Sequence, residues 1–250
     1  MILSFDPILS GRSWLRRVLR VLTGVIVWVL VTGAGGSGRA NQVTTAPNFG
    51  PYHASAGEFT VLPDPEVSAL LGGYSPFTMN YVQAGTFQTF CVERGESLAP
   101  ATTYDVTINN ITMFSGVPLS AGAAYLYQQF ARGNLVYNYA DSPVGGRTTA
   151  GFENAWMLQN AIWFLMGDYS GQESNPYVLQ AATALGGVAA TFAPDNGRHQ
   201  VSILNLWATG QPHEPQHAHQ DLLIYNPVPE PSIAALLPLA ALLMLCRRKS

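Results

Sequence analysis

Three short motifs, widely separated in the sequence, contain the side chains best suited to covalent chemistry. They are Phe90-Cys91-Val92-Glu93, Leu158-Gln159-Asn160-Ala161-Ile162-Trp163 and His219-Gln220-Asp221-Leu222-Leu223-Ile224. Cys91 supplies a thiol, and Gln159 and Gln220 supply primary carboxamides, a group that only Asn and Gln side chains carry. A thiolate that attacks a carboxamide expels ammonia and leaves an activated acyl group on sulfur. An internal thioester is therefore one chemistry that these residues allow.

The first and third motifs have the alternating pattern of strands. Phe90 and Val92 point to one face and Cys91 to the other. Gln220 shares a face with Leu222 and Ile224. Gln220 therefore points inward if that apolar face belongs to the core. A buried cysteine more often serves as a small apolar side chain, so no motif decides the chemistry alone.

The second motif has helical spacing. Trp156, Gln159 and Trp163 fall at positions i, i+3 and i+7 and share one helix face, which places a carboxamide inside an aromatic stripe. A buried carboxamide requires hydrogen-bond partners. We expect Gln159 to bond to backbone groups near Cys91 and to have a structural role.

The elements that position these motifs follow an order of strands, helices and strands. Residues 41–57 are punctuated by proline and glycine and are predicted to be irregular. Strands are predicted at 59–62, 87–92, 103–108, 201–207 and 220–225, and helices at 121–131, 153–166 and 177–185. This order predicts an α+β fold, an antiparallel β-sandwich or barrel with an inserted helical subdomain. Without an internal repeat or long linker, residues 41–227 are expected to form one domain.

Composition excludes several classes of function. The chain has 250 residues, of which 48% are apolar and only 11% charged, so extensive disorder is not expected. Residues 41–227 contain four Arg against thirteen acidic residues and no lysine, which disfavours nucleic-acid binding. The two cysteines, Cys91 and Cys246, are too few for a disulfide framework.

Residues 1–40 have the organisation of a secretory signal peptide. Arg12, Arg16, Arg17 and Arg20 precede an apolar run over residues 21–31, which is followed by small residues. The run is shorter than the roughly 20 residues that a membrane-spanning helix needs. Export with cleavage is therefore expected, and a retained anchor is the alternative.

Residues 228–250 resemble the PEP-CTERM sorting signal of Gram-negative bacteria. Pro229-Glu230-Pro231 precedes an uncharged apolar stretch, and Arg247, Arg248 and Lys249 follow it. The resemblance implies an exosortase as processing partner and a precursor held in the membrane by its C-terminal helix. The expected location is the cell envelope, cell surface or extracellular matrix. An ordinary tail anchor is the alternative.

The three motifs together, over roughly residues 55–226, resemble the bacterial surface thioester domain. That resemblance implies a thioester between Cys91 and Gln220, with Gln159, Trp163 and Trp156 as its supporting shell. It also implies covalent adhesion to a nucleophile on a surface or matrix partner, in a single turnover and without a cofactor. The chain departs from the family at Leu158, where threonine is usual, and at His219, where an apolar residue is usual.

Other chemistries compete with this interpretation. A cysteine hydrolase would need a histidine partner for Cys91, and no local signature of such an enzyme surrounds it. His213, His217 and His219 could converge on a metal, but histidines in a proline-flanked loop are more often solvated, and no metal is expected. The alternative from a different class is a non-covalent structural or carbohydrate-associated matrix protein with a free Cys91.

Overall fold

The computed structural model describes residues 41–47, 57–71, 85–139 and 149–227. The proposed signal peptide and the proposed sorting signal lie outside the described residues. Within the described ranges, no helix combines the length and the apolar character needed to cross a membrane.

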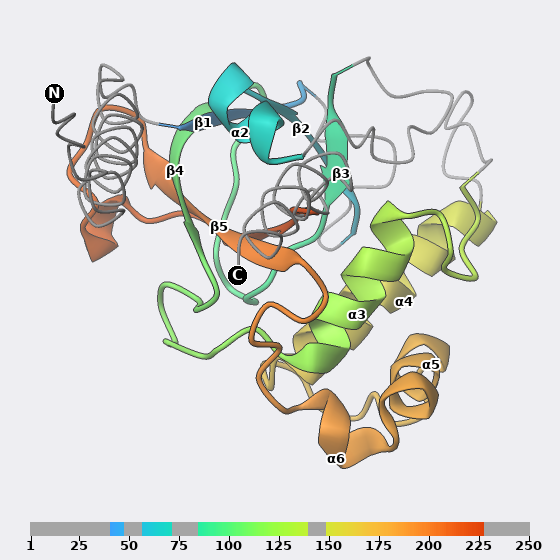
Figure 1. The fold of residues 1–250 in the computed structure, drawn as a ribbon. Helices are drawn as coiled ribbons and strands as arrows, with labels where there is room; N and C mark the ends of the chain where they lie inside the picture. Colours follow the sequence, from blue (N-terminus) through green and yellow to red (C-terminus); the bar gives the residue numbers. More distant parts are fainter. Residues whose placement is uncertain (1–40, 48–56, 72–84, 140–148, 228–250) are drawn as a thin grey trace, which may run out of the picture. The chain divides into compact units, whose positions relative to one another are not determined.

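Six antiparallel strands form one sheet in the order β3-β2-β1-β4-β5-β6 (Figure 1). Central pairing is extensive, with Val43 of β1 opposite Pro63 of β2 and Tyr104 of β4. The strands are β1 (Gln42–Thr45), β2 (Phe59–Pro63), β3 (Phe87–Thr89), β4 (Thr103–Asn109), β5 (Val201–Ala208) and β6 (Leu222–Tyr225).

The two outer strands of this sheet approach each other, so that it forms a nearly closed barrel. Thr89 Oγ1 donates to the carbonyl of Leu223 at 2.6 Å, and Val92 N donates to the carbonyl of Asp221 at 2.9 Å. Between these bonds, Cys91 forms an isolated antiparallel bridge with Leu222. We call this contact between residues 89–92 and 221–223 the seam.

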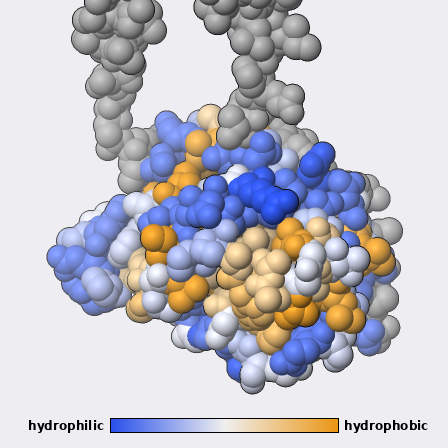
Figure 2. Space-filling view, turned by 60° about the horizontal axis from the view of Figure 1, so that its bottom comes forward, coloured by the Kyte–Doolittle hydropathy of each residue, from blue (hydrophilic) through white to orange (hydrophobic). Residues whose placement is uncertain are grey.

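Most of the helices lie between β4 and β5 in the sequence. Ser120 caps α3 by accepting from the amide of Ala123, and Gly186 ends α5 in the left-handed conformation. The helices are α2 (Pro65–Leu70), α3 (Ala121–Ala131), α4 (Thr149–Leu165), α5 (Pro176–Leu185) and α6 (Val188–Thr191), with the 3₁₀ helix η1 at Pro215–His217. Figure 2 turns the lower side of Figure 1 forward and shows apolar and hydrophilic residues side by side on this surface.

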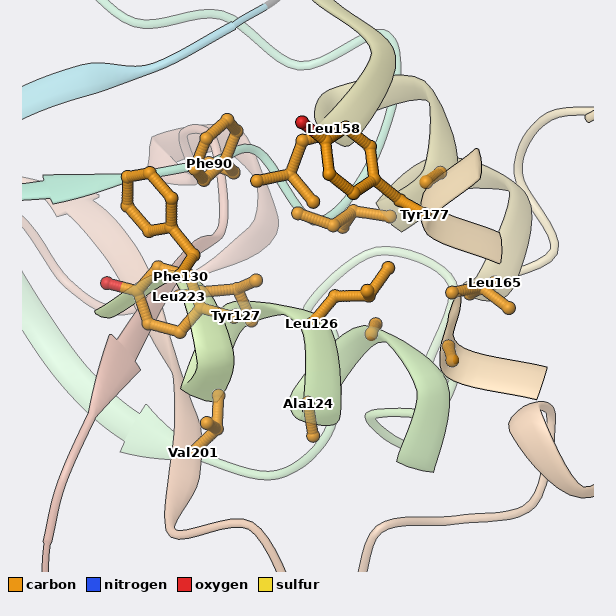
Figure 3. Packing of buried hydrophobic residues seen from close by; sticks show 14 of the residues in the cluster. Phe90, Ala124, Leu126, Tyr127, Phe130, Leu158, Leu165, Tyr177, Val201 and Leu223 are labelled. Carbon is orange, nitrogen blue, oxygen red and sulfur yellow. The ribbon is translucent and has the colours of Figure 1, made fainter. Parts of the chain in front are cut away.

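Two hydrophobic clusters use opposite faces of the sheet. The inner cluster draws apolar side chains from all six strands, including Val61, Tyr104 and Leu222. The helix-face cluster joins Phe90 and Leu223 at the seam to the helices, as Figure 3 shows with Phe130 and Leu158 close to them. The seam is therefore packed on its helix side by an apolar core.

The fold class expected from the sequence, α+β with an antiparallel barrel and an inserted helical region, is the one observed. The prediction that residues 41–57 are irregular was wrong at its start, because β1 occupies Gln42–Thr45 and lies between β2 and β4. The predicted strand at 87–92 ends at Thr89, after which only Cys91 pairs, by a bridge. Helix α4 also begins earlier than predicted, at Thr149.

Candidate functional site

Cys91 and Gln220 lie on the same side of the seam. Cys91 is bridged to Leu222, the first residue of β6, and Gln220 lies two residues before this strand, with its amide bonded to the carbonyl of Ser97. Both residues line one cavity of about 350 Å³, together with Trp156 and Trp163 of α4. The structure thus brings into one cavity four of the five residues that the resemblance assigned to the thioester and its supporting shell.

The fifth residue, Gln159, holds Cys91 by its backbone. Its Oε1 accepts from Cys91 N at 2.9 Å, and its Nε2 donates to the carbonyl of Cys91 at 2.8 Å. The side chain is completely buried, so these bonds satisfy a carboxamide and a peptide group that would otherwise be costly to bury. The expected bonds between Gln159 and backbone near Cys91 are confirmed. Both polar atoms of the Gln159 carboxamide are thus hydrogen-bonded to the Cys91 backbone.

Aromatic rings form the wall beside the thiol. Trp163 is buried and packs against Cys91, with Phe59 and Tyr169 next to them. The Arg94 guanidinium lies over the Tyr169 ring, 4.7 Å from its centroid, and 5.9 Å from the Trp163 ring. The cavity is therefore lined by aromatic side chains near the sulfur. Trp156 is 38% exposed, so the cavity is accessible to solvent at this rim.

The Gln220 carboxamide is held by its nitrogen. Nε2 donates to the carbonyl of Glu93 at 2.7 Å, and it lies 3.3 Å from Glu96 Oε2 and from the carbonyl of Asp221. All three acceptors surround the atom that would leave as ammonia. The carboxamide of Gln220, unlike that of Gln159, therefore has its leaving nitrogen next to a titratable side chain.

Three carboxyl groups gather at this end of the seam. Glu93, Glu96 and Asp221 can place one oxygen each within 4.8 Å of one another. Glu93 accepts from the amide of Ser115 at 2.9 Å, and Asp221 accepts from the amide of Met113 at 2.7 Å. These bonds to the segment after β4 give Glu93 and Asp221 structural roles.

The environment of the cluster keeps protons on carboxyl groups. The pKa of Glu96 is raised to about 8, mainly by burial; the hydrogen bond from the Asp221 amide lowers it, and the nearby charges of Asp221 and Glu93 raise it. Burial also raises the pKa of Asp221 to about 7. A proton can therefore reside on this cluster near neutral pH.

The Cys91 thiol is held in its protonated form. Burial is the larger cause of its raised pKa, and the charge of Glu96 adds to it. The thiol is 5% exposed and makes no disulfide. A nucleophilic attack by this sulfur therefore needs a group that accepts its proton as the new bond forms.

The histidines considered as metal ligands have separate surroundings. His213 stacks on Trp207 with a centroid separation of 4.9 Å, and His219 packs edge-on against Tyr104 at 4.8 Å. Among the residues that the structure describes, no histidine belongs to a close group of three side chains that could ligate a metal; the Glu93, Glu96 and Asp221 carboxyl groups do lie close together, as acidic side chains commonly do without an ion.

Sequence reasoning did not single out Glu96, Arg94, Phe59 or Tyr169, all of which border Cys91 or its cavity. Glu96 lies only five residues after Cys91, and Gly95 between them adopts a positive φ of 108°. A tight turn at a glycine can bring the following side chain back to the preceding strand, but this local signal is weak, because acidic residues in such loops usually face solvent. The aromatic residues carried no such local signal.

Comparison of the chain with family models, with curated proteins and with solved structures gives no match.

Proposed function

We propose that the domain carries an internal thioester between Cys91 Sγ and Gln220 Cδ and uses it to attach the protein covalently to a nucleophile on a surface or matrix partner. The observation that carries this proposal is the placement of both side chains in one cavity at the seam. An exported, envelope-processed protein would display such a bond, and the sequence of both ends supports that location. The bond would be used once, so the protein would not be an enzyme.

The surroundings suit storage of an activated acyl group. Trp163 and Phe59 shield the sulfur, and exclusion of water slows hydrolysis of a reactive bond. The clamp by Gln159 fixes the Cys91 backbone, which keeps the sulfur in position for attack. Because the only lysine of the chain is Lys249, no lysine of residues 41–227 competes with an external amine.

A cavity that is open at one rim also gives a partner access. Trp156 lies at the accessible side and Arg94 borders the same space. An external amine or hydroxyl would enter there and attack the acyl carbon, forming an amide or ester with Gln220 and returning the Cys91 thiol.

The test compares the mass and the thiol reactivity of the full chain with those of matched variants. We expect the purified protein to be lighter by one ammonia than Cys91→Ala or Gln220→Ala, after correction for each substitution. Gln216→Ala removes an exposed glutamine and should keep the ammonia loss. Methylamine should add its mass at Gln220 and simultaneously free the thiol of Cys91.

A buried but unreactive cysteine would resist alkylation yet could not transfer mass to a glutamine. Full sequence mass together with a free Cys91 thiol in unreacted protein would overturn the proposal. The non-covalent matrix interpretation would then replace it.

A further inference from the structure

We propose that Glu96 is the proton-transfer residue of the thioester chemistry, accepting the proton of Cys91 and delivering it to the nitrogen that leaves Gln220. This inference rests on the proposed Cys91–Gln220 bond. It is carried by the position of Glu96, whose Oε2 lies 3.3 Å from Gln220 Nε2 and whose side chain shares a cavity with Cys91.

The two oxygens of Glu96 are differently engaged. Oε2 accepts from the amide of Asp221 at 2.8 Å, which anchors the carboxyl group to the seam. Oε1 is buried and receives no hydrogen bond from a donor among the described residues, although the Glu93 carboxyl group is close enough to share a proton with Glu96. A buried carboxylate oxygen without a donor is unfavourable unless it gains a proton or a new partner, so this oxygen is a ready acceptor.

The step balances with these groups alone. The S–H proton of Cys91 passes to the Glu96 carboxylate while sulfur attacks Cδ of Gln220. The protonated Glu96 then gives that proton to Nε2 as the Cδ–Nε2 bond breaks. Thiol and carboxamide become thioester and ammonia, and Glu96 returns to its starting form.

The same residue would act in the reverse direction when a partner attacks. Attack by an amine repeats the reverse path, so Glu96 accepts the proton of the amine and returns it to the sulfur. Glu96 also lines a second cavity of about 550 Å³, which offers the released ammonia a route away from this carboxyl group.

Charged and titratable groups around Glu96 set the protonation state that this role requires. Glu93 and Asp221 lie in the same carboxyl cluster, Cys91 and Arg94 border the first cavity, and Asp168 and His219 border the second. The raised pKa of Glu96, about 8, places its titration within the range where amine attack can be measured.

The experiment follows two rates in the full chain by mass spectrometry: loss of ammonia as the thioester forms, and opening of the formed thioester by methylamine. Glu96→Gln is the variant, and Glu173→Gln, an exposed carboxylate, is the control. A folded Glu96→Gln that loses ammonia slowly or not at all supports the inference, and loss of ammonia at the wild-type rate contradicts it. Glutamine retains an oxygen that can accept from the Asp221 amide, so the fold should persist, and circular dichroism checks this. General acid–base catalysis contributes typically 10²–10⁴-fold, so Glu96→Gln should slow opening by about 100-fold or more. Glu173→Gln should react at the wild-type rate.

A pH profile separates this role from a structural one. In the wild type, the opening rate per unprotonated methylamine should rise with pH as Glu96 loses its proton, and Glu96→Gln should abolish that rise. Glu96→Asp, which keeps the carboxyl group, should recover part of the rate and of the pH dependence.

Failure of this inference is distinct from failure of the thioester itself. If wild-type protein shows the ammonia loss but Glu96→Gln reacts at the wild-type rate with the same pH profile, Glu96 has no proton-transfer role. If Glu96→Gln proves unfolded, a wild-type opening rate per unprotonated methylamine that is flat through pH 8 would overturn the inference. If the wild type lacks the ammonia loss, the proposed function falls first.

Discussion

The two faces of the seam differ in what they bury, although they share the same backbone. Toward the helices, Phe90 and Leu223 contribute to a continuous apolar cluster with Leu158 (Figure 3). Toward the cavity, Cys91 and Gln220 lie beside aromatic rings and carboxyl groups. Apolar burial is favourable, whereas burial of carboxyl groups is costly unless they are paired or protonated. The helix face thus stabilises the backbone that holds the chemically capable face.

Substitutions in the helix-face cluster should have the largest effect on the stability of the domain. Leu158 is completely buried in that cluster, so Leu158→Ala should lower the free energy of unfolding by about 3–4 kcal/mol through lost burial and a cavity. Denaturant unfolding would measure the change. Leu179→Ala, at a site on α5 with 49% exposure, should cost less than about 0.5 kcal/mol. Equal stability of the two variants would contradict a stabilising role for this face.

A change of pH should have a smaller effect on the free energy of unfolding. It acts through buried carboxyl groups, some at the seam and one elsewhere in the domain. Burial raises the pKa of Glu58 from about 4.5 to about 8, against a hydrogen bond from Tyr137. A carboxyl group with a raised folded-state pKa stabilises the fold below its unfolded pKa, and this contribution disappears as pH rises through the folded value. The pKa values of Glu96 and Asp221 are also raised, so these two groups change the stability in the same direction.

We therefore expect the free energy of unfolding to decrease as pH rises from 5 to 8.5, because each of these carboxyl groups then loses the proton that the folded state favours. Denaturant titrations across this range would measure the slope. Glu58→Gln should flatten it, and the slope that remains belongs to the seam carboxyl groups. Stability that increases from pH 5 to pH 8.5 in the wild type would show that these carboxyl groups are not buried as described.

The sequence predicted those parts of the fold that local interactions determine. Helix α3 was predicted with its observed bounds, because the Ser120 cap and the Arg132-Gly133 stop are local signals. Strand β1 was missed because four residues of mixed polarity give little pattern. Its strand conformation depends on β2 and β4 on either side.

The same distinction applies to the candidate site. The face assignment of Cys91, opposite to Phe90, follows from alternation along a strand and agrees with the packing at the seam. The strand predicted at 220–225 begins only at Leu222, so Gln220 reaches the cavity from the segment before β6. The position of Glu96 beside Gln220 could not be predicted from alternation along a strand, since an acidic residue in a glycine-containing loop normally faces solvent. Its contact with Gln220 requires the near closure of the barrel, which joins segments more than 120 residues apart.

The smallest expected effect lies at the contact between the two faces, where Gln159 of α4 holds Cys91. Gln159→Ala leaves a buried amide and carbonyl of Cys91 without these partners and should cost about 2 kcal/mol of unfolding free energy. Gln128→Ala is the matched control and should cost less, because Gln128 is only partly buried; it donates to the carbonyl of His199 at 2.9 Å and accepts from Gln129 Nε2 at 3.3 Å. Denaturant unfolding gives both values, and mass spectrometry gives the fraction of thioester formed. Since the clamp positions the sulfur but donates no reacting atom, Gln159→Ala should reduce thioester formation without abolishing it. Complete loss in folded Gln159→Ala, together with an ammonia loss retained in Gln220→Ala, would reverse the assignment of the two glutamines.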